Sequence, residues 1–127
     1  MDMEMTEPEK QVAEFLRELG LWYKYEFPVF LYDDKERPRL WEPDFFLPKL
    51  GLYVEVCGSE EPDYTFREKI YYKNEICVIF LHCYKEEKTW KQFLIDRLES
   101  IREKRSSLIS EAIKRAADGK TTIRKVV

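Results

Sequence analysis

Residues 41–58, WEPDFFLPKLGLYVEVCG, carry the most information about the fold of this chain. Pro48 and Gly51 divide the stretch into two strand-like apolar runs, a pattern typical of a β-hairpin. Asp44 begins the first run, and Glu55 stands near the end of the second. Two carboxylates on adjacent strands of one hairpin can meet at a single point. Paired oxygen ligands of this kind suit Mg²⁺ or Mn²⁺.

The pattern outside this hairpin predicts an α/β domain with a mixed sheet of about four strands. Helices are expected at 6–19, 64–74 and 86–118, and strands at 21–32, 40–47, 52–57 and 76–81. The resulting order is helix, three strands, helix, strand and helix. Residues 102–107 interrupt the apolar stripe of the last helix, so either one long helix or a helical pair fits the pattern.

The hairpin stretch resembles the signature of the PD-(D/E)xK nuclease superfamily, the fold of many restriction enzymes and of archaeal Holliday junction resolvases. In that signature, an Asp that follows Pro begins the second core strand. A Glu or Asp lies on the third strand, and a Lys follows it two residues later. Pro43, Asp44 and Glu55 match the first two parts of the signature, and Cys57 occupies the Lys position.

The resemblance extends over residues 6–82 and implies a restriction-endonuclease-like α-β-β-β-α-β core. It also implies a metal-dependent endonuclease that hydrolyses DNA phosphodiester bonds, with Mg²⁺ or Mn²⁺ as its cofactor. The implied metal ligands are the side chains of Asp44 and Glu55, a main-chain carbonyl near Val56, and Glu9 in the opening helix. The alternative is a catalytically inactive nuclease-fold module that binds DNA or a partner protein.

A further catalytic element of this family is a cation that orients the attacking water and stabilises developing charge. Cys57 carries no such charge. In some branches the lysine lies in the helix after the third strand, and that helix here contains Arg67, Lys69 and Lys73. We expect Lys69 to be the catalytic cation, with Arg67 as the second choice. Arg67 could instead grip a phosphate with two guanidinium nitrogens. The alternative is that all three are ordinary surface charges.

Several of these polar residues also have a structural interpretation. Thr6 and Glu9 have the spacing of a helix capping box, so Glu9 is either a cap or a metal ligand. Cys77, His82 and Cys83 match no familiar zinc pattern. We therefore expect buried structural cysteines and a histidine at the surface.

Composition and charge favour one globular domain. The chain has 127 residues, of which 44% are hydrophobic, 37% charged and 15% aromatic. Residues 1–84 carry 10 Lys/Arg and 18 Asp/Glu, and are expected to form the acidic nuclease-like core. Residues 85–127 carry 12 Lys/Arg and 7 Asp/Glu, and are expected to form a basic helical extension. We expect this extension to pack on the same domain or on a second subunit, as in a homodimer, and its charge favours DNA as a partner.

The sequence also indicates where the protein resides. No apolar run approaches the length of a membrane span. The acidic first ten residues, MDMEMTEPEK, lack the apolar segment of a secretory signal. We therefore expect a cytoplasmic protein without a membrane anchor.

Overall fold

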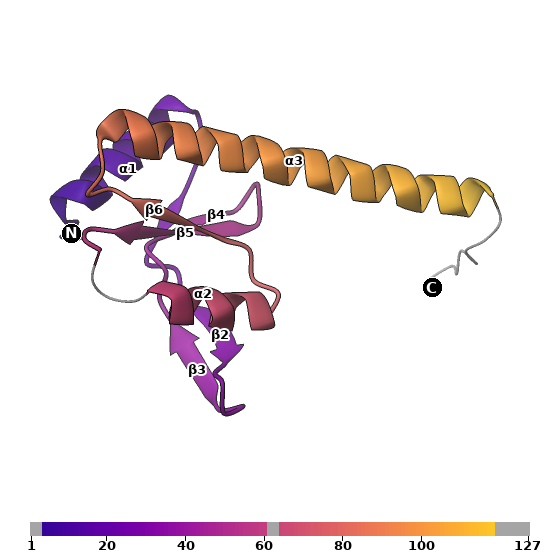
Figure 1. The fold of residues 1–127 in the computed structure, drawn as a ribbon, viewed down its shortest axis with the longest axis horizontal. Helices are drawn as coiled ribbons and strands as arrows, with labels where there is room; N and C mark the ends of the chain where they lie inside the picture. Colours follow the sequence, from indigo (N-terminus) through magenta and orange to yellow (C-terminus); the bar gives the residue numbers. More distant parts are fainter. Residues whose placement is uncertain (1–3, 61–63, 119–127) are drawn as a thin grey trace. The chain divides into compact units, whose positions relative to one another are not determined.

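The computed structural model describes residues 4–60 and 64–118, which form an α/β fold with a long C-terminal helix (Figure 1). The elements are α1 (Glu7–Glu18), β1 (Lys24–Tyr25), β2 (Val29–Tyr32), β3 (Pro38–Trp41), β4 (Phe45–Leu47), β5 (Leu52–Cys57), α2 (Tyr64–Lys73), β6 (Val78–His82) and α3 (Glu87–Ala117). The main sheet has the order β1-β4-β5-β6, and β2 pairs with β3 in a separate hairpin. Neighbouring strands are antiparallel except for β5 and β6, which are parallel, so the predicted mixed sheet is confirmed.

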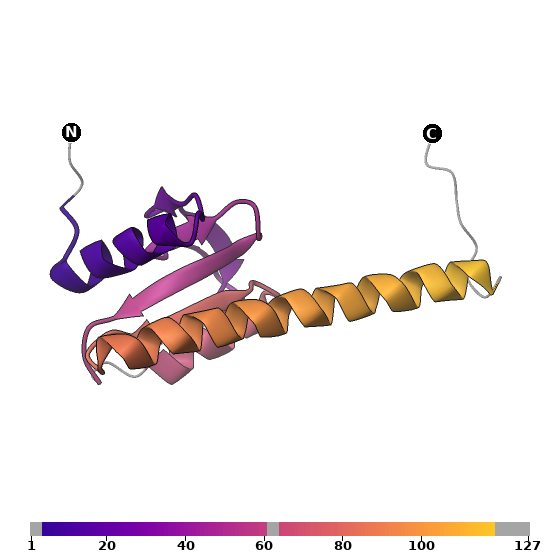
Figure 2. The same ribbon diagram turned by 90° about the horizontal axis from the view of Figure 1, so that it is seen from above.

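Helices cover both faces of the main sheet. α1 and the first turns of α3 lie on one face, and α2 lies on the other (Figures 1 and 2). Between α1 and α3, the rings of Phe15 and Trp90 meet edge to face with centroids 5.7 Å apart. On the α2 side, Cys57 packs in one cluster with Ile70 and Tyr71. Each face of β5 is therefore buried, as expected for a strand inside a sheet.

α1 begins at a capping box and ends beside a glycine. The main-chain N–H of Glu9 donates to the Thr6 hydroxyl (3.3 Å), and the N–H of Thr6 donates to the Glu9 carboxylate (2.9 Å). Gly20 follows the C-cap with a φ of 73°, a region that favours glycine. The capping interpretation of Glu9 is thus confirmed.

The structure divides two of the expected strands. The run 21–32 forms β1 and β2, because Glu26 takes a positive φ of 53° and breaks the extended chain between them. The run 40–47 is divided between β3, in the separate hairpin, and β4, in the main sheet. The prediction of two continuous strands is wrong. Pro28 and Pro43 lie at the two breaks, and proline has no N–H to donate to a ladder.

α3 is one continuous helix of 31 residues, so the long helix is confirmed and its alternative, a helical pair, is wrong. Four charged residues and two serines at 102–107 break the apolar stripe and leave the backbone helical. The chain divides into two compact units, Met1–Leu94 and Ile95–Val127, and the first turns of α3 bury Trp90 and Leu94 within the first unit. Across the described ranges 4–60 and 64–118, no helix combines the length and apolarity that a membrane span requires.

Candidate active site

Asp44 and Glu55 face each other at the end of the β4–β5 ladder. The register pairs Phe45 with Val54, so Asp44 and Glu55 are the next positions outward. Residues that oppose each other in an antiparallel pair point to the same face, with β-carbons about 5 Å apart. The Asp44 carboxylate also accepts a hydrogen bond from the main-chain N–H of Val56, with 2.7 Å between Oδ2 and N. The hairpin therefore brings the two acidic residues together and fixes one of them against β5.

Glu9 brings a third carboxyl group to this place. The Tyr25 hydroxyl donates to Glu9 Oε1 over 2.8 Å, and the Glu9 carboxyl group also forms a hydrogen bond with that of Asp44. Two carboxyl groups form such a bond only when one of them carries a proton. Glu9 is therefore both a helix cap and a neighbour of Asp44.

Asp44 holds this proton. Burial and the charges of Glu55 and Glu9 raise the pKa of Asp44 to about 8, although the hydrogen bond from Val56 favours its ionised form. Burial alone would raise the pKa of Glu9 as well, but the hydrogen bonds that its carboxylate accepts outweigh burial and lower it. Near neutral pH, the pair is thus a protonated Asp44 beside an ionised Glu9.

Glu55 is buried and ion-paired with α2. Its Oε2 accepts hydrogen bonds from Arg67 Nη2 (2.5 Å), Arg67 Nε (3.2 Å) and the Tyr71 hydroxyl (2.6 Å). Burial opposes the charge on Arg67, but Glu55 outweighs it and raises the pKa of the guanidinium. Burial, together with Glu55, raises the pKa of Tyr71 far above its usual range, so its phenol remains a donor. Arg67 also lies over the ring of Trp41, with its Cζ 4.4 Å from the centroid.

The oxygen ligands at this place fit a hard divalent cation in their chemistry. Glu9 and Asp44 share a proton that an ion could replace, and Glu55 needs a positive partner that Arg67 now supplies. Within residues 4–60 and 64–118, no group of three or more His, Cys, Asp or Glu residues is arranged to hold a metal ion. Glu55 is instead bound by Arg67 and Tyr71 of α2.

The two candidate cations of α2 lie on different sides of the helix. Arg67 and Tyr71 are four residues apart and both reach Glu55. Lys69 is exposed and lies about 200° around the helix from Arg67. The structure therefore brings Arg67, the second choice from the sequence, to the acidic residues, and leaves Lys69 at the surface. Lys73 binds elsewhere, to the main-chain carbonyl of Asp33.

The three cysteines and the one histidine stand apart from this chemistry. Cys57 is fully buried, and burial raises the pKa of its thiol to about 12, so it cannot supply a charge. Cys77 and Cys83 are free and half-buried. His82 Nδ1 lies 3.0 Å from the Tyr84 hydroxyl, and burial lowers the pKa of the imidazole. Cys77, His82 and Cys83 are all half-buried, because they lie at or just beyond the ends of β6, an edge strand of the main sheet, so the expectation of buried cysteines and a surface histidine is wrong.

Sequence reasoning did not find the residues that support the acidic side chains. In the sequence, Tyr25 and Tyr71 look like ordinary packing residues. In the structure, the hydroxyl of each donates a hydrogen bond to a carboxylate of the site. The spacing of Arg67 and Tyr71 is the signal that could have identified Tyr71, because it places both on one helix face. No family model, curated protein or solved structure matches this chain, and its function is therefore inferred from the geometry of the site.

Proposed function

We propose that this chain is a Mg²⁺- or Mn²⁺-dependent endonuclease that hydrolyses DNA phosphodiester bonds. The observation that carries the proposal is the pairing of Asp44 with two other acidic residues, since it lies opposite Glu55 on the β4–β5 hairpin and forms a hydrogen bond with Glu9 of α1. Clustered carboxylates repel one another in a partly buried place, and a proton, an arginine or a metal ion must offset that cost. Binding of a divalent cation would offset the repulsion between these carboxylates and would explain why they lie together.

The residues that would hold the ion are Asp44, Glu55, Glu9 and the main-chain carbonyl of Val56. A divalent ion bound there would polarise the phosphate and lower the pKa of a water molecule. Asp44 would give up its proton on binding. Tyr25 would keep the Glu9 carboxylate oriented through the hydrogen bond that it donates.

Arg67 is the cation that we assign to the reaction in place of the lysine of the related motif. It is always protonated, so it stabilises negative charge on the phosphate and does not act as a base. Trp41 and Tyr71 hold its guanidinium beside Glu55. A bound metal ion would either share Glu55 with Arg67 or displace Arg67 from it. The exposure of Lys69 favours Arg67 for this role.

The second candidate function is an inactive nuclease-fold module that binds DNA or a partner protein. The buried, neutral thiol of Cys57 favours it, because position 57 supplies no catalytic charge. The ion pair between Arg67 and Glu55 favours it too, because it neutralises a residue that would have to bind the metal. The two functions share a fold and differ in metal binding and turnover.

A metal titration tests the proposed site. Thermal unfolding is followed with Mn²⁺ added to metal-free protein, for the wild type, Asp44→Asn and Glu55→Gln. The matched control is Glu14→Gln, which removes an exposed carboxylate of α1. We expect Mn²⁺ to raise the melting temperatures of the wild type and of the control. The melting temperatures of Asp44→Asn and Glu55→Gln should not change when Mn²⁺ is added. An equal response in all four proteins would contradict the site.

A further inference from the structure

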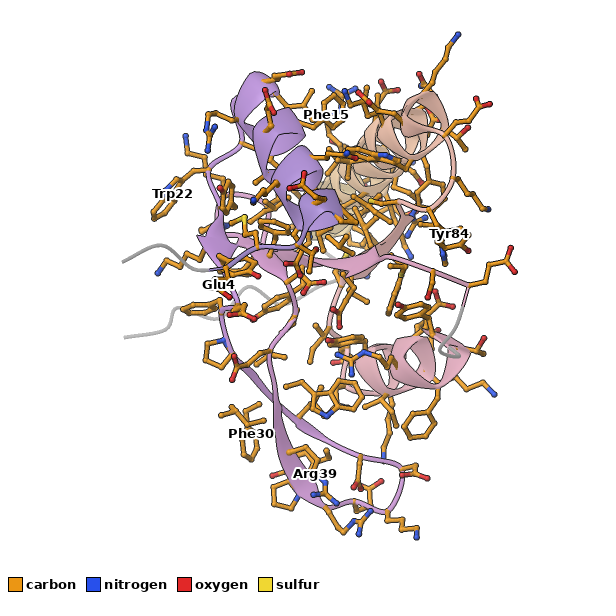
Figure 3. The ribbon with its side chains drawn as sticks, turned by 90° about the vertical axis from the view of Figure 1, so that its left-hand side faces the viewer. Glu4, Phe15, Trp22, Phe30, Arg39 and Tyr84 are labelled. Atoms are coloured by element: carbon orange, nitrogen blue, oxygen red, sulfur yellow. The ribbon has the colours of Figure 1, made fainter. Side chains whose placement is uncertain are left out.

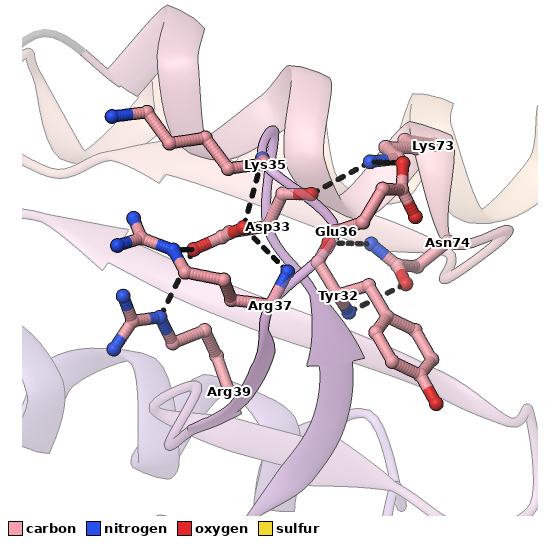
Figure 4. A network of polar contacts seen from close by, with 8 residues as sticks. All are labelled: Tyr32, Asp33, Lys35, Glu36, Arg37, Arg39, Lys73 and Asn74. Carbon is pink, nitrogen blue, oxygen red and sulfur yellow. Dashed lines mark hydrogen bonds and ion pairs between the residues drawn. The ribbon is translucent and has the colours of Figure 1, made fainter.

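The β2–β3 hairpin is anchored to α2 by polar contacts at its turn (Figure 4). Asn74 accepts a hydrogen bond from the N–H of Tyr32 (2.9 Å) and donates to its carbonyl (2.8 Å). Lys73 donates to the carbonyl of Asp33 (2.6 Å) and to the Glu36 carboxylate. Both residues lie at the C-terminal end of α2. The turn is therefore held in a defined position on the first unit.

Asp33 organises the inside of this turn. The main-chain N–H groups of Arg37 and Lys35 donate to its Oδ1, each over 2.9 Å. Its Oδ2 accepts from Nε of Arg37 (2.9 Å) and from Nε of Arg39 (3.0 Å). The N–H of Arg37, with the other donors, holds the pKa of Asp33 well below its usual range despite its burial. One ionised carboxylate thus fixes two guanidinium groups side by side.

The two arginines keep their outer ends available. Each arginine uses its Nε to bind Asp33. The side chain of Arg37 remains 55% exposed and that of Arg39 46% exposed. In Figure 4 the terminal nitrogens of Arg37 and Arg39 point away from Asp33 to one side, and the Lys35 side chain extends to the same side. A guanidinium presents a planar fork of donors that matches two oxygens of a phosphate. The turn thus offers two positioned forks for an anion.

The same face of the hairpin leads to the candidate site. Arg39 and Trp41 are two residues apart on β3, so they point to the same face. Figure 3 shows Arg39 on the side of the hairpin opposite to Phe30. Trp41 in turn packs on Arg67, which binds Glu55. A row of guanidinium groups and one indole therefore runs from the turn to the carboxylates.

We propose that this guanidinium row, formed by Arg37, Arg39 and Arg67 with Trp41 between them, binds the backbone of a DNA strand and leads it to the carboxylates. The destination of the strand rests on the proposed function, whereas the binding does not require catalysis. An extended row of cations matches the repeating charge of a phosphate backbone. Because residues 1–84 carry an excess of acidic residues, this row is a local feature and not a general basic character.

Anisotropy of a fluorescein-labelled single-stranded DNA of about 20 nucleotides tests the proposal, in EDTA and over a range of salt concentrations. The test variant is Arg37→Gln/Arg39→Gln. The control is Lys10→Gln/Arg17→Gln, which removes two exposed cations from α1. Each lost phosphate contact should reduce the slope of log K against log salt by about 0.7, so we expect a decrease of about 1.4 for the test variant. Its affinity at low salt should fall about tenfold or more, and the control should bind as the wild type does.

Equal binding by the test and control variants would overturn the proposal. So would a wild type that binds a labelled poly-glutamate peptide and no DNA, which would make the row a docking site for an acidic protein. If circular dichroism shows that the double variant is unfolded, Arg37→Gln and Arg39→Gln are measured singly. Each leaves one guanidinium on Asp33, and each should reduce the slope by about 0.7. The remaining result is a wild type that binds DNA through these arginines and yet cleaves no DNA. That result would refute the proposed nuclease function and would support the guanidinium row as a DNA-binding site.

Discussion

Asp44→Asn should stabilise the metal-free protein, increasingly so as the pH rises. The pKa of Asp44 is about 8 in the folded protein, against an ordinary value of 3.8. A raised pKa means that the protonated folded form is the stable one. The contribution of Asp44 is therefore fully present below about pH 4 and is lost as the pH rises through about 8. Asparagine mimics the protonated acid, because it can accept from Val56 and donate to Glu9.

The size of the effect follows from the two pKa values. They differ by about four units, and each unit corresponds to about 1.4 kcal/mol, which gives a ceiling between 5 and 6 kcal/mol. Asp44 is only half-buried and shares its proton with Glu9, so solvent screening and this coupling reduce the effect. We expect Asp44→Asn to raise the free energy of unfolding by about 2 to 3 kcal/mol at pH 8.5, and by about 1 kcal/mol at pH 4.5, where an unfolded-state Asp is already mostly ionised.

Urea unfolding in the presence of a chelator, at pH 4.5, 5.5, 7.0 and 8.5, measures the difference between variant and wild type. Taking the difference cancels titrations common to both proteins, such as that of His82. Glu14→Gln serves as the control for the loss of one surface carboxylate and should show a difference independent of pH. If the difference for Asp44→Asn is equally flat, the proton shared with Glu9 does not exist and the account of the cluster fails.

Three further predictions concern other parts of the chain. Tyr71→Phe removes a hydroxyl that donates to Glu55, and should lower the free energy of unfolding by about 1 to 2 kcal/mol in urea titrations. The thiol of Cys57 is fully buried, so it should react with a thiol reagent only in denaturant, as absorbance kinetics would show; rapid labelling of the native protein would contradict its burial. We also propose that α3 pairs with a second copy of the chain, because Ile109 and Ile113 are 61% and 65% exposed. Light scattering should then give a dimer that Ile109→Glu/Ile113→Glu converts to a monomer, and a monomeric wild type would contradict this.

The parts of the fold that the sequence predicts are those set by local rules. The β4–β5 hairpin follows from its turn residues, and its register then places Asp44 opposite Glu55. The capping box at Thr6 and Glu9 follows from spacing alone. These features need no knowledge of distant contacts.

The parts that the sequence does not predict depend on tertiary contacts. The alternating run 21–32 has the pattern of one strand, and the break at Glu26 shows only in the backbone conformation. The choice between Arg67 and Lys69 depends on the rotation of α2 over the sheet, because helical spacing allows either to face Glu55. The partnership of Glu9 with Asp44 joins residues 35 positions apart and rests on how α1 lies against the hairpin.

Cleavage of purified branched, flapped, duplex and single-stranded DNA tests the proposed nuclease activity most directly. Reactions contain Mn²⁺ or a chelator, with the wild type, Asp44→Asn and Arg67→Gln side by side. We predict that the wild type cleaves at least one of these substrates only with Mn²⁺. Asp44→Asn should lose cleavage together with metal binding, and Arg67→Gln should lose cleavage while it still binds the metal. A wild type that cleaves none of the four substrates, or an Asp44→Asn variant that cleaves at the wild-type rate, would contradict the assignment of a metal-dependent nuclease.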